Sequence, residues 1–84
     1  MYSVESDPAA QKQVAALPGE AIAKYAEVVA TLGVAPWSGD AYDRLRPDAN
    51  LRTLPFGPGS EGLVIYMVLE DQRRVAVLRV IWTG

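Results

Sequence analysis

The sequence predicts a small α+β domain, because its local patterns follow the order strand, helix, helix, strand, strand, strand. Three observations support this prediction. The first six residues are β-prone and alternate from Tyr2 onward, and two helical patterns follow with only a Pro-Gly pair between them. Three apolar segments typical of strands follow residue 50. We therefore expect one strand, a helical hairpin and three further strands joined by hairpins.

The opening segment, MYSVES, is expected to be a strand with Tyr2 and Val4 on one face. Asp7 stands where a helix N-cap is expected, and Pro8 occupies the first helical position. The first helix is then predicted from about Asp7 to Leu17. Its apolar face should consist of Ala10, Val14 and Leu17.

The second helix is predicted after the break at Pro18 and Gly19. It should run from Glu20 to Leu32, with Gly33 as its C-terminal stop. Because the break is so short, the two helices should form a hairpin. The predicted apolar stripe of the second helix consists of Ile22, Tyr25, Ala26, Val29 and Leu32.

The second half of the chain is predicted to be a loop followed by three strands. Residues 34–50 contain two prolines and one glycine and show no sustained period, so they are expected to be a loop. The segments 51–56, 62–70 and 74–82 are β-like. The middle one is a nearly continuous apolar run, which is typical of a central strand covered on both faces.

Composition limits the functions that the chain can have. Its 84 residues predict one domain over 1–84, and 50% of them are hydrophobic. The chain has no cysteine and no histidine, which excludes disulfides, zinc sites and Cys–His or Ser–His catalysis, and its net charge of −2 disfavours plain nucleic-acid binding. We expect no metal and no cofactor. A signal peptide and an apolar run of about 20 residues are both missing, so a soluble cytoplasmic protein without a membrane partner is expected.

Two stretches resemble one protein family. The opening YSVESDPAAQKQVAALP and the later GLVIYMVLEDQRRVAVLRVIW, in this order of elements, are similar to the RelE/ParE superfamily of bacterial toxins. The resemblance implies an α+β domain with the helical hairpin on one face of a four-stranded, mainly antiparallel sheet. It also implies a cytoplasmic protein neutralised by a small antitoxin and, in the RelE branch, cleavage of messenger RNA on the ribosome.

The sequence departs from the RelE pattern where that family carries its chemistry. RelE-like nucleases place an arginine shortly before the tyrosine of the central strand, where this chain has Gly62 and Leu63. We expect no counterpart of the basic segment that follows their last strand, since the sequence ends two residues after Trp82. RNA cleavage needs a base, an acid and cationic donors for the phosphate. The candidates for these catalytic roles are Arg52, Arg79 and Tyr66.

Each candidate residue also has a structural alternative. Arg52 and Arg79 are expected to be partly exposed on an uncovered face, and either could simply pair with an acid such as Glu61 or Glu70. Replacing either arginine by alanine should then spare the fold. Tyr66 could be a core residue with its hydroxyl bonded at the edge of the core.

Two tryptophans are candidates for a partner-binding surface. Trp37 lies in a polar loop and Trp82 near the end of the last strand, and either could instead cover an end of the core. We expect Trp82 and Arg79 to bind a partner together with the sheet face that the helices leave open.

Two functions follow from this reasoning. The first is a toxin of a toxin–antitoxin system that cleaves messenger RNA on the ribosome with degenerate catalytic residues. The alternative is a non-catalytic module of the same fold that binds a protein, whether an antitoxin, a small DNA-binding regulator or a topoisomerase. A homodimer is left open.

Overall fold

The computed structural model describes residues 1–84, the whole chain. Its elements, in chain order, are β1 (Ser3–Ser6), α1 (Pro8–Ala15), α2 (Gly19–Val34), the 3-10 turn η1 (Pro36–Ser38), β2 (Asp40–Ala41), β3 (Leu51–Phe56), β4 (Gly62–Leu69), the 3-10 turn η2 (Glu70–Gln72) and β5 (Arg74–Trp82). Neither helix is long and apolar enough to cross a lipid bilayer.

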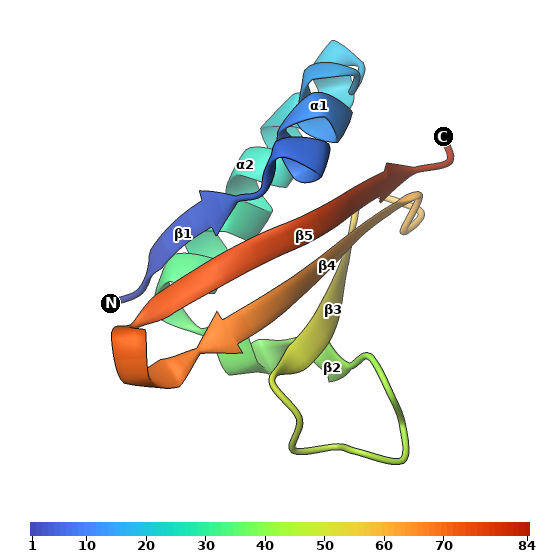
Figure 1. Cartoon of the computed structure of the whole chain (residues 1–84). Helices are drawn as coiled ribbons and strands as arrows, with labels where there is room; N and C mark the ends of the chain where they lie inside the picture. The colour runs from blue at the N-terminus through green and yellow to red at the C-terminus, as the bar shows by residue number, and fades with distance from the viewer.

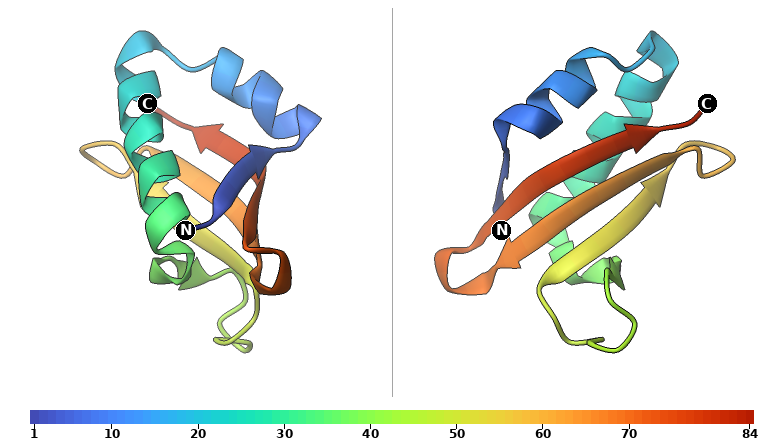
Figure 2. Two further views of the ribbon diagram at one scale, coloured as in Figure 1. Left: turned by 90° about the vertical axis from the view of Figure 1, so that its left-hand side faces the viewer. Right: turned by 45° about the vertical axis from the view of Figure 1, so that its right-hand side comes forward.

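The strands form one mixed sheet in the order β1-β5-β4-β3-β2, with the helical hairpin on one face (Figure 1, Figure 2). β1 runs parallel to β5, and the other neighbours are antiparallel. The predicted α+β order is confirmed, but the sheet has five strands rather than four. The additional strand is only two residues long, pairing Asp40 with Thr53 and Ala41 with Arg52, so it leaves no pattern in the sequence.

The helix caps explain where the two helices begin and end. Asp7 caps α1 as predicted, because its Oδ1 accepts from the backbone N–H of Ala10 at 2.9 Å. The predicted stop of α2 at Gly33 is wrong, since the helix continues to Val34. Gly33 instead lies against β1, where its carbonyl accepts from the backbone N–H of Tyr2 at 2.8 Å.

The buried face of α2 is rotated from the predicted stripe. Ile22 is 45% exposed, whereas Ala21 is completely buried. A small side chain at the contact lets the helix approach the sheet closely, and this close approach fixes which row of residues faces the core. The buried residues of α2 are Ala21, Tyr25, Val28 and Leu32.

The central strand β4 is covered on one face only, which corrects the prediction of two covered faces. Its residues alternate strictly between buried and partly exposed. The buried set, Gly62, Val64, Tyr66 and Val68, lies under the helices. The partly exposed set, Leu63, Ile65, Met67 and Leu69, points to the side without helices. The continuous apolar run therefore marks a sheet with one open, apolar face.

Gly62 is required by the packing of Phe56, its cross-strand partner. A Cβ added at Gly62 would lie 2.4 Å from two carbon atoms of the Phe56 ring. That ring is held in place by Tyr25 and Trp82, whose centroids lie 6.0 and 5.7 Å away. The ring has little freedom to move aside.

We expect Gly62→Ala to lower the free energy of unfolding by about 1–3 kcal/mol through overpacking. Gly19→Ala is the matched control, because an added Cβ there meets nothing within 4 Å. It should leave stability unchanged or raise it slightly. Urea unfolding monitored by circular dichroism measures both, and equal midpoints for the two variants would contradict the packing described.

Candidate functional site

Arg52 is buried and binds the loop that precedes it. Only 8% of the residue is exposed. Its Nη1 donates to the carbonyls of Pro47 and Ala49 at 3.2 and 3.1 Å, and its Nη2 donates to that of Gly39 at 2.6 Å. The ring of Trp37 covers the guanidinium, with Cζ 5.3 Å from the ring centroid. Arg52 is thus neither exposed nor paired with Glu61 or Glu70, and it fastens the 36–50 segment to the sheet.

Tyr66 is fully buried beside Arg52. Its hydroxyl donates to the carbonyl of Pro36 at 2.6 Å. Burial raises the pKa of the phenol, so it stays protonated and remains a donor at neutral pH. Gly39 lies directly over the hydroxyl, where a Cβ would come within 2.3 Å of it. No open path connects the phenol to a substrate. This burial agrees with the alternative that Tyr66 is a core residue whose hydroxyl is hydrogen-bonded.

Arg79 is the one candidate catalytic residue on the open side of the sheet. Its side chain is 51% exposed, and its Nη1 donates to the carbonyl of Leu78 at 2.6 Å. Arg79 forms an ion pair with Asp7, whose Oδ2 lies 3.6 Å from Nη1, so it pairs with an acid as the structural alternative expected, although that acid is neither Glu61 nor Glu70. Arg52 and Tyr66 point to the opposite face, and the structure does not bring the three candidates together.

A bulge in β5 turns Arg79 outward. Val77 pairs with Tyr66 and Arg79 pairs with Ile65, so Leu78 is an extra residue on β5. Without it, strict alternation from Val77 would point Arg79 under the helices. The sequence carries this signal, because the inward-facing apolar positions of β5 shift from odd to even numbers: Val75, Val77, Val80 and Trp82.

Trp82 closes one end of the core instead of joining Arg79. Its ring lies on the helix side against Phe56, with centroids 5.7 Å apart. Its Nε1 is buried without a hydrogen-bond partner. Because Trp82 and Arg79 lie on opposite faces of β5, the predicted surface that combines them does not form.

Trp37 belongs to an exposed polar cluster centred on Glu70, which the sequence reasoning missed. The Glu70 carboxylate accepts from Trp37 Nε1 at 2.8 Å, from the Tyr2 hydroxyl at 2.8 Å and from Arg73 Nη1 at 3.0 Å. These donors, Trp37 first, lower the pKa of Glu70, and the carboxylate raises the pKa of Tyr2. The cluster joins the start of β1, η1 and the β4–β5 connection, which are too far apart in the sequence to suggest a contact.

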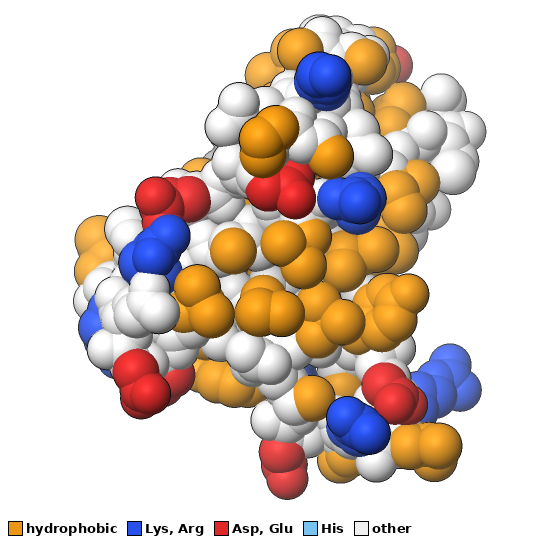
Figure 3. Space-filling model, in the orientation of Figure 1, with side chains coloured by type: hydrophobic (Ala, Val, Ile, Leu, Met, Phe, Trp, Pro, Cys, Tyr) orange, Lys and Arg blue, Asp and Glu red, His pale blue; other side chains and the backbone are white.

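The open face of the sheet is apolar in its middle, and two ion pairs, Arg79 with Asp7 and Arg74 with Glu5, lie toward its β1 edge. Figure 3 shows it as a band of hydrophobic side chains across the strands. Its rows follow the strand register, with Leu51, Met67 and Ala76 aligned at one end and Pro55, Leu63 and Ile81 at the other. We call this surface the open face and define it as Leu51, Thr53, Pro55, Leu63, Ile65, Met67, Ala76, Arg79 and Ile81.

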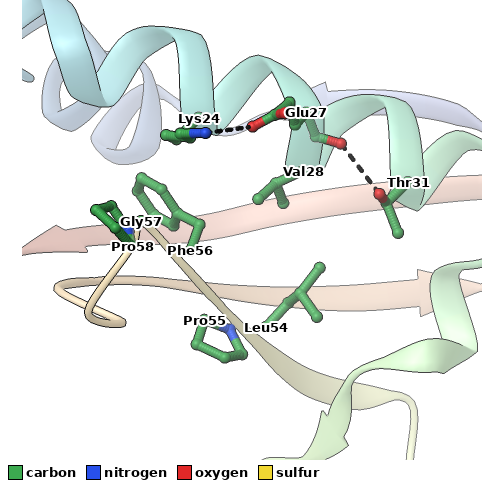
Figure 4. A pocket seen from close by; sticks show the side chains of 9 residues that line it. All are labelled: Lys24, Glu27, Val28, Thr31, Leu54, Pro55, Phe56, Gly57 and Pro58. Atoms are coloured by element: carbon green, nitrogen blue, oxygen red, sulfur yellow. Dashed lines mark hydrogen bonds and ion pairs between the residues drawn. The ribbon is translucent and has the colours of Figure 1, made fainter.

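A groove lies between α2 and β3 (Figure 4). The groove has a volume of about 390 Å³, and Val28 and Phe56 contribute to its lining. Its charges, Lys24 and Glu27, pair with each other at 3.6 Å. The groove thus presents no unpaired titratable side chain for catalysis.

Comparison with known proteins supports the fold. No protein-family model matches the sequence, and no curated protein sequence matches it significantly. Among solved structures, the isolated E. coli RelE toxin matches with a TM-score of 0.81 over 100% of this chain and 86% of that chain, at 14% identity.

Two toxin–antitoxin complexes match as well. A chain of the intact E. coli RelBE complex gives a TM-score of 0.77 at 16% identity, covering 100% of this chain and 99% of that chain. The archaeal RelE–RelB complex from Pyrococcus horikoshii OT3 gives 0.67 at 20% identity, covering 99% and 96%. The chain has the fold of RelE toxins, as the resemblance of the sequence predicted.

The burial of Arg52 overturns the expectation that Arg52→Ala spares the fold. Arg52→Met keeps most of the side-chain length but removes the donors to three carbonyls, and we expect it to lower the free energy of unfolding by about 3 kcal/mol. Arg46→Met is the matched control, since the Arg46 side chain is 79% exposed. Urea unfolding should show little change for the control. A loss below about 0.5 kcal/mol in Arg52→Met would contradict the anchoring role.

The Glu70 cluster should loosen in acid. A lowered pKa means that the folded state prefers the carboxylate form of Glu70. The stabilisation that the cluster gives the folded state is therefore present above the usual carboxyl pKa of about 4.3, and it is lost as the pH falls through the lowered value. The indole N–H resonance of Trp37 should therefore shift below about pH 4. Glu70→Gln should abolish this shift, and the Trp82 resonance serves as the internal control. A Trp37 shift that persists in the variant would exclude Glu70 as its cause.

Proposed function

We propose that the chain is the toxin-type component of a toxin–antitoxin pair and that it acts by binding proteins, including a small antitoxin-like partner. The observation that carries this proposal is the match of the whole chain to RelE toxins. Complexes of RelE with RelB among the matching structures support a protein partner of the antitoxin type. A cytoplasmic location agrees with this role.

The geometry favours this function over cleavage of messenger RNA. Attack by a 2′-hydroxyl needs a base, an acid and cationic donors at one place. The open face offers the Arg79 guanidinium, and the carboxylate nearest to it, that of Asp7, pairs with Arg79 and accepts from the backbone N–H of Ala10. Arg52 and Tyr66 donate hydrogen bonds to backbone carbonyls beneath the helices. Of the three candidate catalytic residues, only Arg79 is therefore left for the ribonuclease alternative, with or without the ribosome.

Inducible expression in a bacterial host tests the proposal. We expect the chain to arrest growth, the product of the neighbouring gene to relieve the arrest, and the ends of cellular messenger RNA to stay as in the uninduced culture. New messenger RNA ends that disappear in Arg79→Ala would establish the ribonuclease alternative instead. Normal growth together with no complex between the two purified proteins would contradict the toxin–antitoxin assignment.

A further inference from the structure

We propose that two copies of this chain associate through the groove between α2 and β3, with the free edges of their β3 strands antiparallel and their α2 helices side by side on the joined sheets. This inference goes beyond the proposed function and does not depend on it. Three features carry it: an unpaired stretch of strand edge, a charge pattern on α2 that is complementary to itself, and the alignment of these two features along the groove.

The outer edge of β3 is unpaired where it borders the groove. β2 pairs with this edge only as far as Thr53. The Leu51 carbonyl accepts from the N–H of Tyr42 on the same edge, so every second residue counted from Leu51 turns its backbone groups outward. The carbonyl of Pro55 and the N–H of Gly57 therefore point to the free edge, and no turn or loop hydrogen bond of the chain uses either group.

These two backbone groups match the same groups of a second copy. In an antiparallel pair with its two-fold axis at Phe56, Pro55 of each copy lies opposite Gly57 of the other. Each Gly57 N–H then donates to the Pro55 carbonyl of the other copy. The Gly57 carbonyl already accepts from the N–H of Ser60 at 3.1 Å, so it needs no donor from the proline nitrogen, which has none to give. The proline thus permits this register and excludes registers that require its N–H.

α2 borders the same groove with a polar stripe. Lys24, Glu27 and Thr31 line the groove, and Glu20 continues their helical spacing. The side chains of Lys24 and Glu27 are 50% and 69% exposed. When two such helices lie antiparallel about a midpoint between residues 25 and 26, Lys24 of each copy faces Glu27 of the other. Glu20 then lies opposite the neutral Thr31, so opposite charges meet and like charges do not.

The midpoints of the strand edge and of the polar stripe lie at the same place along the groove. The ring of Tyr25 packs against that of Phe56, with centroids 6.0 Å apart. Figure 4 shows Lys24 at the Gly57 end of the groove and Thr31 toward the other end. α2 and β3 therefore run in opposite directions along the groove, and one two-fold axis can pass near both midpoints.

The size of the contact predicts a weak dimer. The 16 residues of α2 span about 24 Å, and a sheet with one layer of helices is about 20 Å thick, so the contact covers roughly 500 Å² of each copy. Stable interfaces bury roughly 800 Å² of each partner, and smaller ones are transient. We therefore expect monomer and dimer in an equilibrium that depends on protein concentration. A foreign segment could use the same donor and acceptor, but a second copy necessarily brings both complementary patterns.

Sedimentation equilibrium of the purified chain over a concentration series measures this dimer. We expect the average mass to rise from one chain toward two. Glu27→Lys places lysines opposite each other and should weaken the dimer about tenfold or more, and Lys24→Glu should do the same through opposed carboxylates. Lys24→Glu combined with Glu27→Lys restores opposite charges and should dimerise like the wild type. The matched control is Lys12→Glu on α1, which makes the same charge change away from the groove and should leave the dimer unchanged.

Amide hydrogen exchange measured by NMR reports the strand pairing directly. The Gly57 N–H should exchange more slowly as the protein concentration rises, because the dimer gives it an acceptor. The Gly59 N–H is the internal control, since it already donates to Glu61 Oε1 at 2.7 Å within one chain. Its exchange should not change with concentration. Circular dichroism verifies that every variant folds.

Several outcomes would overturn the inference. A single-chain mass at every concentration would do so, and so would a dimer that Glu27→Lys leaves intact, because that dimer must use another surface. Failure of the combined variant to recover would refute the pairing of Lys24 with Glu27. Slower exchange at Gly57 only when the purified product of the neighbouring gene is added would assign the groove to a foreign segment instead. None of these results decides the proposed function, which the growth experiment tests separately.

Discussion

The buried guanidinium of Arg52 organises the part of the molecule that regular secondary structure leaves undefined. Residues 36–50 contain only one 3-10 turn and a two-residue strand, and their backbone carbonyls need donors. Arg52 supplies Nη1 and Nη2 to three of these carbonyls, and Tyr66 supplies its hydroxyl to a fourth at Pro36. An arginine at this place is stable because its hydrogen bonds compensate much of the cost of burial. These hydrogen bonds hold the loop to the sheet beneath it.

The sequence predicted the elements well where one local rule decided them. Asp7 and Pro8 define the start of α1 by capping chemistry, and the β-like segments match β3, β4 and β5 to within one residue. Prediction failed where distant contacts decided the outcome. The rotation of α2 depends on how closely Ala21 approaches the sheet, and β2 exists only because β3 offers it an edge. Periodicity within one segment carries no information about either contact.

The candidate site could likewise be predicted only where local sequence rules decided the outcome. Sequence reasoning selected Arg52, Tyr66 and Arg79 by residue type, but a strand places neighbouring side chains on opposite faces, and an inserted residue exchanges those faces. The bulge at Leu78 alone separates Arg79 from the side that holds the other two. The shift in the apolar alternation of β5 was visible in the sequence, whereas the acceptors of Arg52, at Gly39 and Pro47, became apparent only from the folded loop.

The two faces of this sheet carry different kinds of side chain. This difference limits the possible functions of the chain more than its fold does. On the helix side, the polar groups of Arg52 and Tyr66 donate hydrogen bonds that hold the loop. These groups are therefore unavailable for chemistry. The open side keeps apolar groups in register across three strands and carries Arg79, which pairs with Asp7. A surface of that kind gains free energy by excluding water from another apolar surface. It has few groups with which to move a proton or hold a phosphate, so the physical chemistry of the open side favours association with a protein over catalysis.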